Sequence, residues 1–186
     1  DIIMGKAEAL VKGEDSPTGG VVIDHYFNVK GIGTVALGVV RFGQIHRHDK
    51  LSAHPSDKMA QIRSIQRHDT DFETAEKGNR VGLALKNIES SELDRGTLLS
   101  NDTSVKQTAM IEGQLELVKY WTKPMEKGMS IHMCKDMQFI AGTVEESSKR
   151  TVRVSIQKPF VYKEGDMATM LYLNGGNLRV VGSIKL

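Results

Sequence analysis

The stretch HYFNVKGIGTVALGVV, residues 25–40, contains the pattern that decides the fold class. Valine, threonine and aromatic residues are frequent in it, as is typical of β-strands, and Gly31, Gly33 and Gly38 interrupt the run. Glycine inside a strand marks a bulge, a tight bend or a close approach of two backbones. Gly31 and Gly33 form a Gly-x-Gly with no third glycine and no helix pattern after it. This pair therefore indicates a glycine-bulged strand rather than a dinucleotide site.

Runs of the same kind recur along nearly the whole chain, each rich in Val, Ile and Thr and each ended by turn residues. Strands separated so regularly by turns predict an all-β sandwich or barrel. The 18 glycines fit the turns and bulges that barrel closure requires. Helix patterns are limited to residues 2–11, which end at Lys12 and Gly13, and to a single turn at residues 89–93. The runs begin at Gly20, Gly33, Met59, Arg80, Thr108, Thr151 and Leu178.

A polar segment, residues 100–104, divides the chain almost in half, and the strand-and-turn pattern restarts after it. We therefore expect two consecutive closed β-barrels, the first over residues 17–102 and the second over residues 105–186. Residues 1–16 have the length and polarity of the end of an upstream domain with a linker. The chain opens with Asp1 rather than with methionine, and we expect a further segment upstream of it.

Charge and composition exclude several classes of protein. The 25 Lys and Arg against 23 Asp and Glu give a net charge of +2, so phosphate binding would depend on local clusters such as residues 123–135 and 149–153. The single cysteine, Cys134, excludes an intrachain disulfide, and its Met-rich surroundings predict a buried apolar side chain rather than a nucleophile. No run approaches the roughly 18 apolar residues of a membrane span. No signal peptide is visible either, and we expect a cytoplasmic protein without membrane contact.

Motifs for nucleotide binding, metal binding and catalysis are missing from the sequence. Neither the phosphate-binding Gly-x-x-x-x-Gly-Lys-Ser/Thr loop nor the guanine-binding Asn-Lys-x-Asp pattern occurs. The six histidines are scattered and no cysteine pair accompanies them, so we expect surface histidines rather than a zinc site. Asp69, Asp71 and Glu73 could hold Mg²⁺, but a solvated turn before Lys77 and Gly78 is favoured. We expect no catalytic residue, metal or cofactor in this chain.

Four blocks between Asp24 and Ser100 resemble, in order and spacing, the second domain of the translational GTPases. The first block, residues 25–40, is similar to the family's Phe-x-Val-x-Gly-x-Gly-Thr-Val strand pair. The rest of the chain, from Lys106 to Leu186, resembles the third domain of the family. The resemblance implies a translation-protein barrel followed by an elongation-factor C-terminal-type barrel. The other three blocks are residues 43–51, residues 61–69, and residues 75–88 running on to 93–99.

In this family the second domain receives the aminoacyl-adenosine end of tRNA, and the third domain touches the T stem. The resemblance therefore implies aminoacyl-tRNA and the ribosome as partners, with GTP and Mg²⁺ held by an upstream GTPase domain. Carried over by position, Phe27, Gly31 and Thr34 match the strand pair that walls the pocket for this end. Gln66 occupies the place of a glutamate that binds the terminal ribose hydroxyl, and an amide can donate or accept there.

Three further positions of the family's site differ from the usual residues. His68 falls where an aromatic or basic side chain is common, Asp69 replaces an arginine, and Arg80 replaces an asparagine next to the amino acid. These differences suit another amino-acid side chain, or no tRNA at all. The segment Arg63-Ser-Ile-Gln66 and the short third domain resemble the selenocysteine-specific factors and the archaeal initiator-tRNA carrier more than bacterial elongation factor Tu.

The sequence leaves three functional hypotheses. The leading one is the tRNA- and ribosome-facing part of an elongation-factor-like protein, which takes up the aminoacyl end of tRNA for delivery. The second is a regulatory or protein-interaction module that keeps both barrels but has lost nucleotide chemistry. The third, a small barrel enzyme with its own ligand, depends only on the histidines and on residues 69–73.

Overall fold

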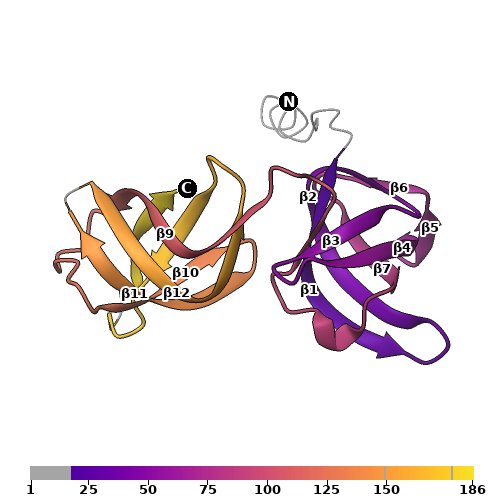
Figure 1. Ribbon diagram of the computed structural model, residues 1–186, viewed down its shortest axis with the longest axis horizontal. Helices are drawn as coiled ribbons and strands as arrows, with labels where there is room; N and C mark the ends of the chain where they lie inside the picture. Colours follow the sequence, from indigo (N-terminus) through magenta and orange to yellow (C-terminus); the bar gives the residue numbers. More distant parts are fainter. Residues whose placement is uncertain (1–17, 149, 177) are drawn as a thin grey trace. The chain divides into compact units, whose positions relative to one another are not determined.

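The computed structural model describes residues 18–186 with the exception of residues 149 and 177, so the predicted linker at 1–16 and helix at 2–11 lie outside the described residues. Contacts divide the chain after Thr103 into two compact units. Both units consist of antiparallel strands (Figure 1). The strands of the first unit are β1 (Gly19–Val29), β2 (Gly33–His46), β3 (Lys50–His54), β4 (Lys58–Arg67), β5 (Thr70–Phe72), β6 (Thr74–Glu76), β7 (Arg80–Lys86) and β8 (Leu98–Ser100).

The first unit is a closed barrel. Its strands follow the order β1-β8-β3-β4-β7-β2, and the pairing of β2 with β1 closes the cylinder. Two short strands lie off this path: β5 pairs with the end of β4, and β6 pairs with the end of β2. Closure leaves the six strands of the cylinder without a free edge, which removes a route to aggregation.

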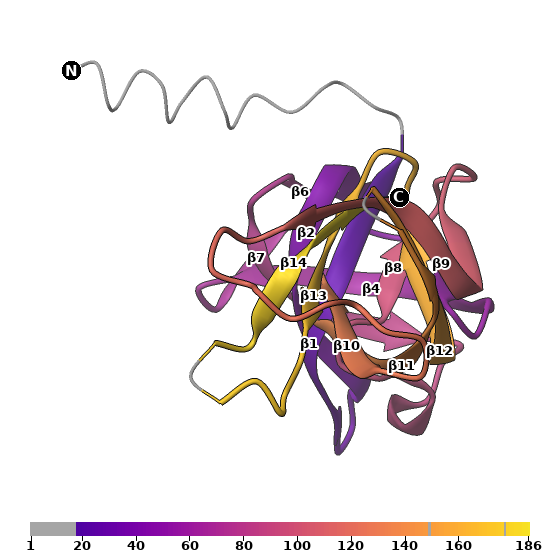
Figure 2. The ribbon, with the colours of Figure 1, turned by 90° about the vertical axis from the view of Figure 1, so that its left-hand side faces the viewer.

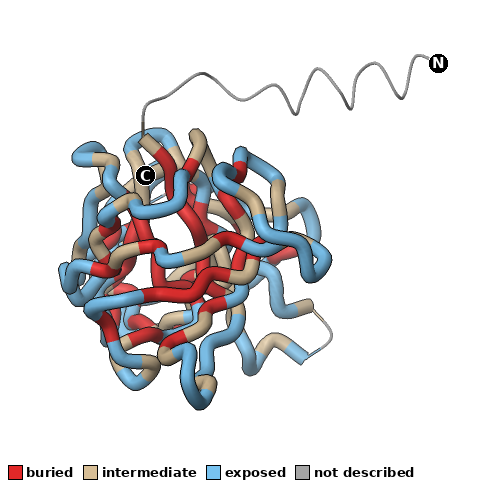
Figure 3. Tube along the Cα trace, turned by 90° about the vertical axis from the view of Figure 1, so that its right-hand side faces the viewer, coloured by how far each residue is buried: buried red, intermediate tan, exposed pale blue. Residues whose placement is uncertain are grey.

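Alternate residues of each strand fill the first barrel, as the period of two in a β-strand requires. Ile23, Ile45, Leu51, Ile65 and Leu83 are fully buried. Burial of each such side chain contributes about 1.5–3 kcal/mol relative to exposure. Figure 3 shows this barrel from outside, with buried stretches along the strands and exposed residues at the connecting loops. The alternation sends every second side chain to the outer surface, where the candidate site lies.

The β1–β2 hairpin extends beyond the body of the barrel (Figure 1). Gly31 and Gly33 in its turn have φ values of +83° and +95°, and a Cβ added at either would meet nothing within 4 Å. These two glycines are needed for their backbone conformation and not for space. Gly38 is needed because a side chain does not fit there: a Cβ would lie 2.4 Å from the carbonyl oxygen of Val22. The glycine pattern therefore marks one turn and one close strand contact.

The second unit is also a closed barrel, with the strand order β10-β11-β12-β9-β14-β13 (Figure 2). Phe160, Ile131 and Met133 are buried at its centre. The buried amide of Gln138 donates to the carbonyl of Val161 and accepts from its N–H, both at 2.8 Å, and so replaces a backbone pair between strands. Its strands are β9 (Lys106–Leu117), β10 (Ser130–Lys135), β11 (Gln138–Ser147), β12 (Thr151–Tyr162), β13 (Met167–Leu171) and β14 (Val180–Lys185).

The all-β fold with two consecutive closed barrels is confirmed. The single turn predicted at residues 89–93 is present as a 3-10 helix, η1 (Ser90–Glu92), with a capping box between Glu89 and Glu92. The predicted domain limits of 17–102 and 105–186 stay predictions.

We predict that Gly113→Ala destabilises the second barrel by about 1–3 kcal/mol, because an added side chain would overpack it. A Cβ at Gly113 would lie 2.2 Å from the carbonyl oxygen of Lys185 and 2.5 Å from Cγ2 of Ile184. Urea unfolding followed by fluorescence measures the change, since the single tryptophan, Trp121, is buried in this barrel.

The control is Gly82→Ala in the first barrel, where the new Cβ would lie at an ordinary 3.5 Å from Leu37. Circular dichroism should show this variant to be as stable as the parent or slightly more stable. Equal destabilisation by the two variants would contradict the close approach of β9 and β14.

Candidate nucleic-acid interface

The outer face of β2, β7 and β4 carries a row of mostly apolar side chains. Val35 is in register with Ala84 on β7, and Ala84 is in register with Ser64 on β4. On the other side Val35 pairs with Phe27 of β1, whose ring is 43% exposed. Because paired residues project to the same side of a sheet, these four side chains form one strip. The neighbouring Ala36 points into the core.

A second row runs beside the first. Leu37, 39% exposed, is in register with Gly82, and Gly82 is in register with Gln66. His25 extends this row onto β1. Gly82 has no side chain, so the middle of the row is lower than its two ends. The Gln66 amide donates to Asp71 Oδ1 at 2.9 Å, and its carbonyl oxygen makes no hydrogen bond to the residues that the structure describes.

Arg80 begins a third row, in register with Val39. The preceding residue, Asn79, accepts a hydrogen bond of 2.8 Å from Nη1 of Arg67, and Arg67 stacks at 3.7 Å over the ring of Phe72. Arg67 therefore ties the β4–β5 hairpin to the turn that presents Arg80. Arg67 could not be singled out from the sequence as a site residue, because its partners are known only once the strands are paired.

His68 and Asp69 form the turn of the β4–β5 hairpin, beyond the pair Arg67 and Thr70. Their φ values are +49° and +61°, as in the two-residue turns with positive φ that suit the twist of a hairpin. The two side chains thus lie at the end of the hairpin, beside the rows and not within them.

Thr34 lies beneath the outer face. It is only 3% exposed, and its hydroxyl donates to the carbonyl of Ile88 at 2.7 Å. Gly31 lies at the hairpin turn. Of the residues predicted from the sequence, the structure brings Phe27, Gln66 and Arg80 onto one face, while Thr34 supports that face from below. Their role in binding stays a prediction.

The histidines and carboxylates weighed as metal ligands have separate partners. His46 lies 3.5 Å from Asp49, and His54 lies 3.0 Å from Asp57. Glu73 pairs with Arg47 at 3.0 Å. Within the described part of the chain no three His, Cys, Asp or Glu side chains are grouped so that they could hold a metal ion. The same residues include no helix long and apolar enough to cross a membrane.

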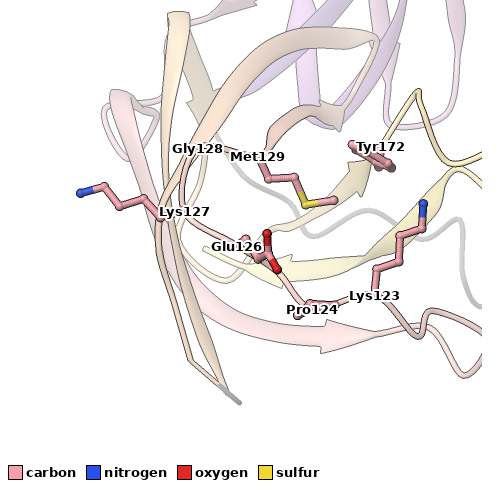
Figure 4. A pocket seen from close by; sticks show the side chains of 7 residues that line it. All are labelled: Lys123, Pro124, Glu126, Lys127, Gly128, Met129 and Tyr172. Atoms are coloured by element: carbon pink, nitrogen blue, oxygen red, sulfur yellow. The ribbon is translucent and has the colours of Figure 1, made fainter.

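A pocket of about 430 Å³ opens on the second barrel (Figure 4). Its aromatic wall, Tyr172, packs edge-on against the buried Trp121 at 5.8 Å, and the ammonium of Lys123 lies 5.4 Å from the Tyr172 ring. In Figure 4 Met129 and Tyr172 border the hollow, whereas Lys127 points away from it. The ammonium of Lys123 is thus attracted to the ring of Tyr172, and the carboxylate of Glu126 also lines the pocket. The lining residues are Lys123, Pro124, Glu126, Lys127, Gly128, Met129 and Tyr172.

Residues 33–100 match the family model of elongation factor Tu domain 2. The match spans β2 to β8 and includes the strands that carry Gln66 and Arg80. Together with the second barrel, the match makes the chain similar to domains II and III of the translational GTPases. The predicted resemblance is confirmed.

The relatives in sequence support a translation-factor-like role. An uncharacterized protein of Methanocaldococcus jannaschii is 41% identical over 166 residues, which cover 89% of this chain and 53% of that protein. The selenocysteine-specific elongation factor of the same organism is 30% identical over 66% of this chain and 26% of its own length. Elongation factor 1-alpha of Thermofilum pendens is 26% identical over 82% of this chain and 36% of its own. The chain thus spans about half of its relatives' length or less.

Solved structures share the fold. The apo form of translation elongation factor SelB from Methanococcus maripaludis superimposes with a TM-score of 0.85 at 19% identity, over 99% of this chain and 44% of that chain. A bacterial selenocysteine-specific elongation factor, EF-Sec, gives a TM-score of 0.83 at 21% identity, over 98% of this chain and 30% of that chain. Both likenesses extend over the two barrels.

We predict that Thr34→Val destabilises the first barrel by about 1–3 kcal/mol, because the buried carbonyl of Ile88 would lose its hydrogen bond. Chemical unfolding followed by circular dichroism measures this change. Thr143→Val, at an exposed strand position, is the control and should alter stability by less than about 0.5 kcal/mol. Unchanged stability with weakened ligand binding in Thr34→Val would show instead that the hydroxyl serves a ligand.

Cys134 should react slowly with alkylating agents. It is half-buried between its strand partners Phe139 and Thr169, and burial raises the pKa of its thiol. A raised pKa leaves less thiolate at pH 7–8, and the thiolate is the reactive form. Iodoacetamide labelling followed by mass spectrometry should be slower for the native protein than for the urea-unfolded chain. Faster labelling of the native protein would point to an activated thiol.

Proposed function

We propose that the outer face of the first barrel binds the aminoacylated 3′ end of a tRNA, within a protein that delivers this tRNA to the ribosome. The observation that supports the proposal best is the alignment of Phe27, Gln66 and Arg80 on one face through the register of β1, β2, β7 and β4. An exposed aromatic ring, a hydrogen-bonding amide and a cation then lie in three successive rows of this face.

The chemistry of this face suits a terminal nucleotide with an ester-linked amino acid. The apolar row with Phe27 and Val35 offers a flat surface on which a base can pack. Gln66, whose carbonyl oxygen is available, can accept a hydrogen bond from a ribose hydroxyl. Arg80 supplies a positive charge on the same face, next to the position proposed for the amino acid.

The second barrel would contribute to the same complex by contacts with the tRNA backbone. The Lys123 ammonium beside Tyr172 is one place where a phosphate can bind. With a net charge of only +2, this binding would rely on a few placed cations and not on a broad basic surface. GTP and Mg²⁺ would be held by a GTPase domain elsewhere in the full-length protein, which we expect in the cytoplasm.

A second candidate is an elongation-factor-like module for regulation or protein interaction. The departures at Gln66, Asp69 and Arg80 from the usual residues of the family favour it. A degenerate phosphate-binding loop in the full-length protein would support this alternative, whereas an intact loop supports delivery of tRNA.

The leading proposal is tested by measuring the binding of aminoacyl-tRNA and of deacylated tRNA. Both are measured with this chain at low salt and with the full-length protein in the presence of GTP. The aminoacylated form should bind more tightly. Arg80→Gln should weaken its binding about tenfold, since a hydrogen bond to a charged group contributes about 1.5–3 kcal/mol. Gln66→Ala should weaken it by a smaller factor.

The control is Lys50→Gln, which removes one positive charge from an exposed residue of β3, a strand that carries none of the three proposed binding residues. This variant should bind like the parent. Equal affinity for both forms of tRNA, or no binding by either protein, would sink the proposal.

A further inference from the structure

Arg63 occupies a β-bulge at the edge of the candidate site. The register of β4 against β7 shifts between Ile62 and Ser64, so Arg63 is the extra residue that has no partner on β7. A bulge turns the side chain of its extra residue away from the regular alternation. The side chain of Arg63 is exposed, while Ile62 before it and Ile65 after it are fully buried.

The guanidinium of Arg63 reaches across the sheet to the β1–β2 hairpin, where Nη1 donates to the carbonyl oxygen of Ile32 at 3.3 Å. Strand β7 and the start of β2 lie between these two residues in the strand order. The inside of the barrel is filled there by Ile62 and Leu85. The side chain must therefore cross over the outer surface, along the end of the row that contains Val35 and Ala84.

This position leaves most of the guanidinium available to a ligand. The bond to Ile32 uses one of its five N–H groups. Among the described residues Arg63 has no other side-chain hydrogen bond and no ion pair. The guanidinium of Arg63 is thus held beside the row that contains Val35 and Ala84, without a carboxylate to neutralise its charge.

We infer that Arg63 is a base-binding residue, whose guanidinium plane stacks on the base of the 3′-terminal nucleotide as that base lies on Val35 and Ala84. The inference rests on the proposed function. If the ribose lies at Gln66 and the amino acid towards Arg80, the base falls on the opposite side of Gln66, in the row beneath Arg63. Arginine stacks on planar groups because its guanidinium is flat and weakly hydrated, and lysine does not replace it there.

Two other roles for Arg63 give different results in the same experiment. A structural latch needs only a donor that reaches Ile32, and Arg63→Lys would preserve both stem and donor. A phosphate contact needs only the charge, which lysine also keeps. Stacking requires the planar guanidinium, so Arg63→Lys should weaken binding almost as much as Arg63→Met.

The test measures binding of an aminoacyl-tRNA that carries 2-aminopurine as its 3′-terminal base, with the full-length protein and GTP. Stacking quenches the fluorescence of 2-aminopurine, and the parent protein should quench it. Arg63→Met and Arg63→Lys should each weaken binding about fivefold to tenfold and reduce the quenching, a loss typical of one stacked base. The slope of log affinity against log salt should not change in Arg63→Lys. Lys50→Met, at an exposed position of the neighbouring strand β3, is the control for a lost charge.

Parent-like affinity and quenching in Arg63→Lys would overturn the inference, as would parent-like values in Arg63→Met. A fall of about one in the salt slope of Arg63→Met, with Arg63→Lys unaffected, would indicate a phosphate contact and also overturn it. Failure of the proposed function is distinguishable, because the parent protein would then not prefer aminoacyl-tRNA at all. Circular dichroism melts of both variants show whether the barrel remains folded.

Discussion

The register of β2, β7 and β4 is the constraint on which the candidate site depends. A slip of one residue in any of these pairings would send Val35, Leu37 and Gln66 into the core and bring core residues out. Closure of the cylinder by β1 and β2 holds this register, because each strand is bonded on both sides. Bulges after Ile23 and at Arg63 then adjust where single side chains emerge. The outer face is therefore a product of the whole barrel.

The fold could be predicted from the sequence because its signals are local. Glycines at positive φ, alternating apolar residues and a polar junction are visible without knowledge of the pairing. Phe27, Gln66 and Arg80 could be proposed because the resemblance to the translational GTPases carries the family's site residues over to these positions. Thr34 was carried over from the same resemblance; its hydroxyl donates to a carbonyl 54 residues away, a contact that the sequence does not reveal, and its role in binding stays a prediction. The importance of Arg63 and Arg67 could not be predicted, since Ile32, Phe72 and Asn79 become their neighbours only after folding.

The two barrels show different ways of placing polar groups in a β-cylinder. In the first barrel the polar groups of interest lie on the outer surface, above a core of aliphatic residues. In the second, Gln138 is buried and substitutes for a missing backbone pair with Val161, while Tyr172 and Lys123 border a pocket at one end. The family match covers residues 33–100 of the first barrel, and the fold likeness covers both barrels.

The short strands β5 and β6 lie off the closed path of the first barrel. They carry the turn with His68 and Asp69 and lead to Arg80, yet the cylinder is complete without them. Changes at the turn with His68 and Asp69 can therefore be accommodated without opening the barrel, whereas Phe72 and Ala75 pack against its core. Evolution, or an engineer, can vary this turn to alter what the module accepts while the scaffold stays the same, much as antibody loops vary on a constant framework.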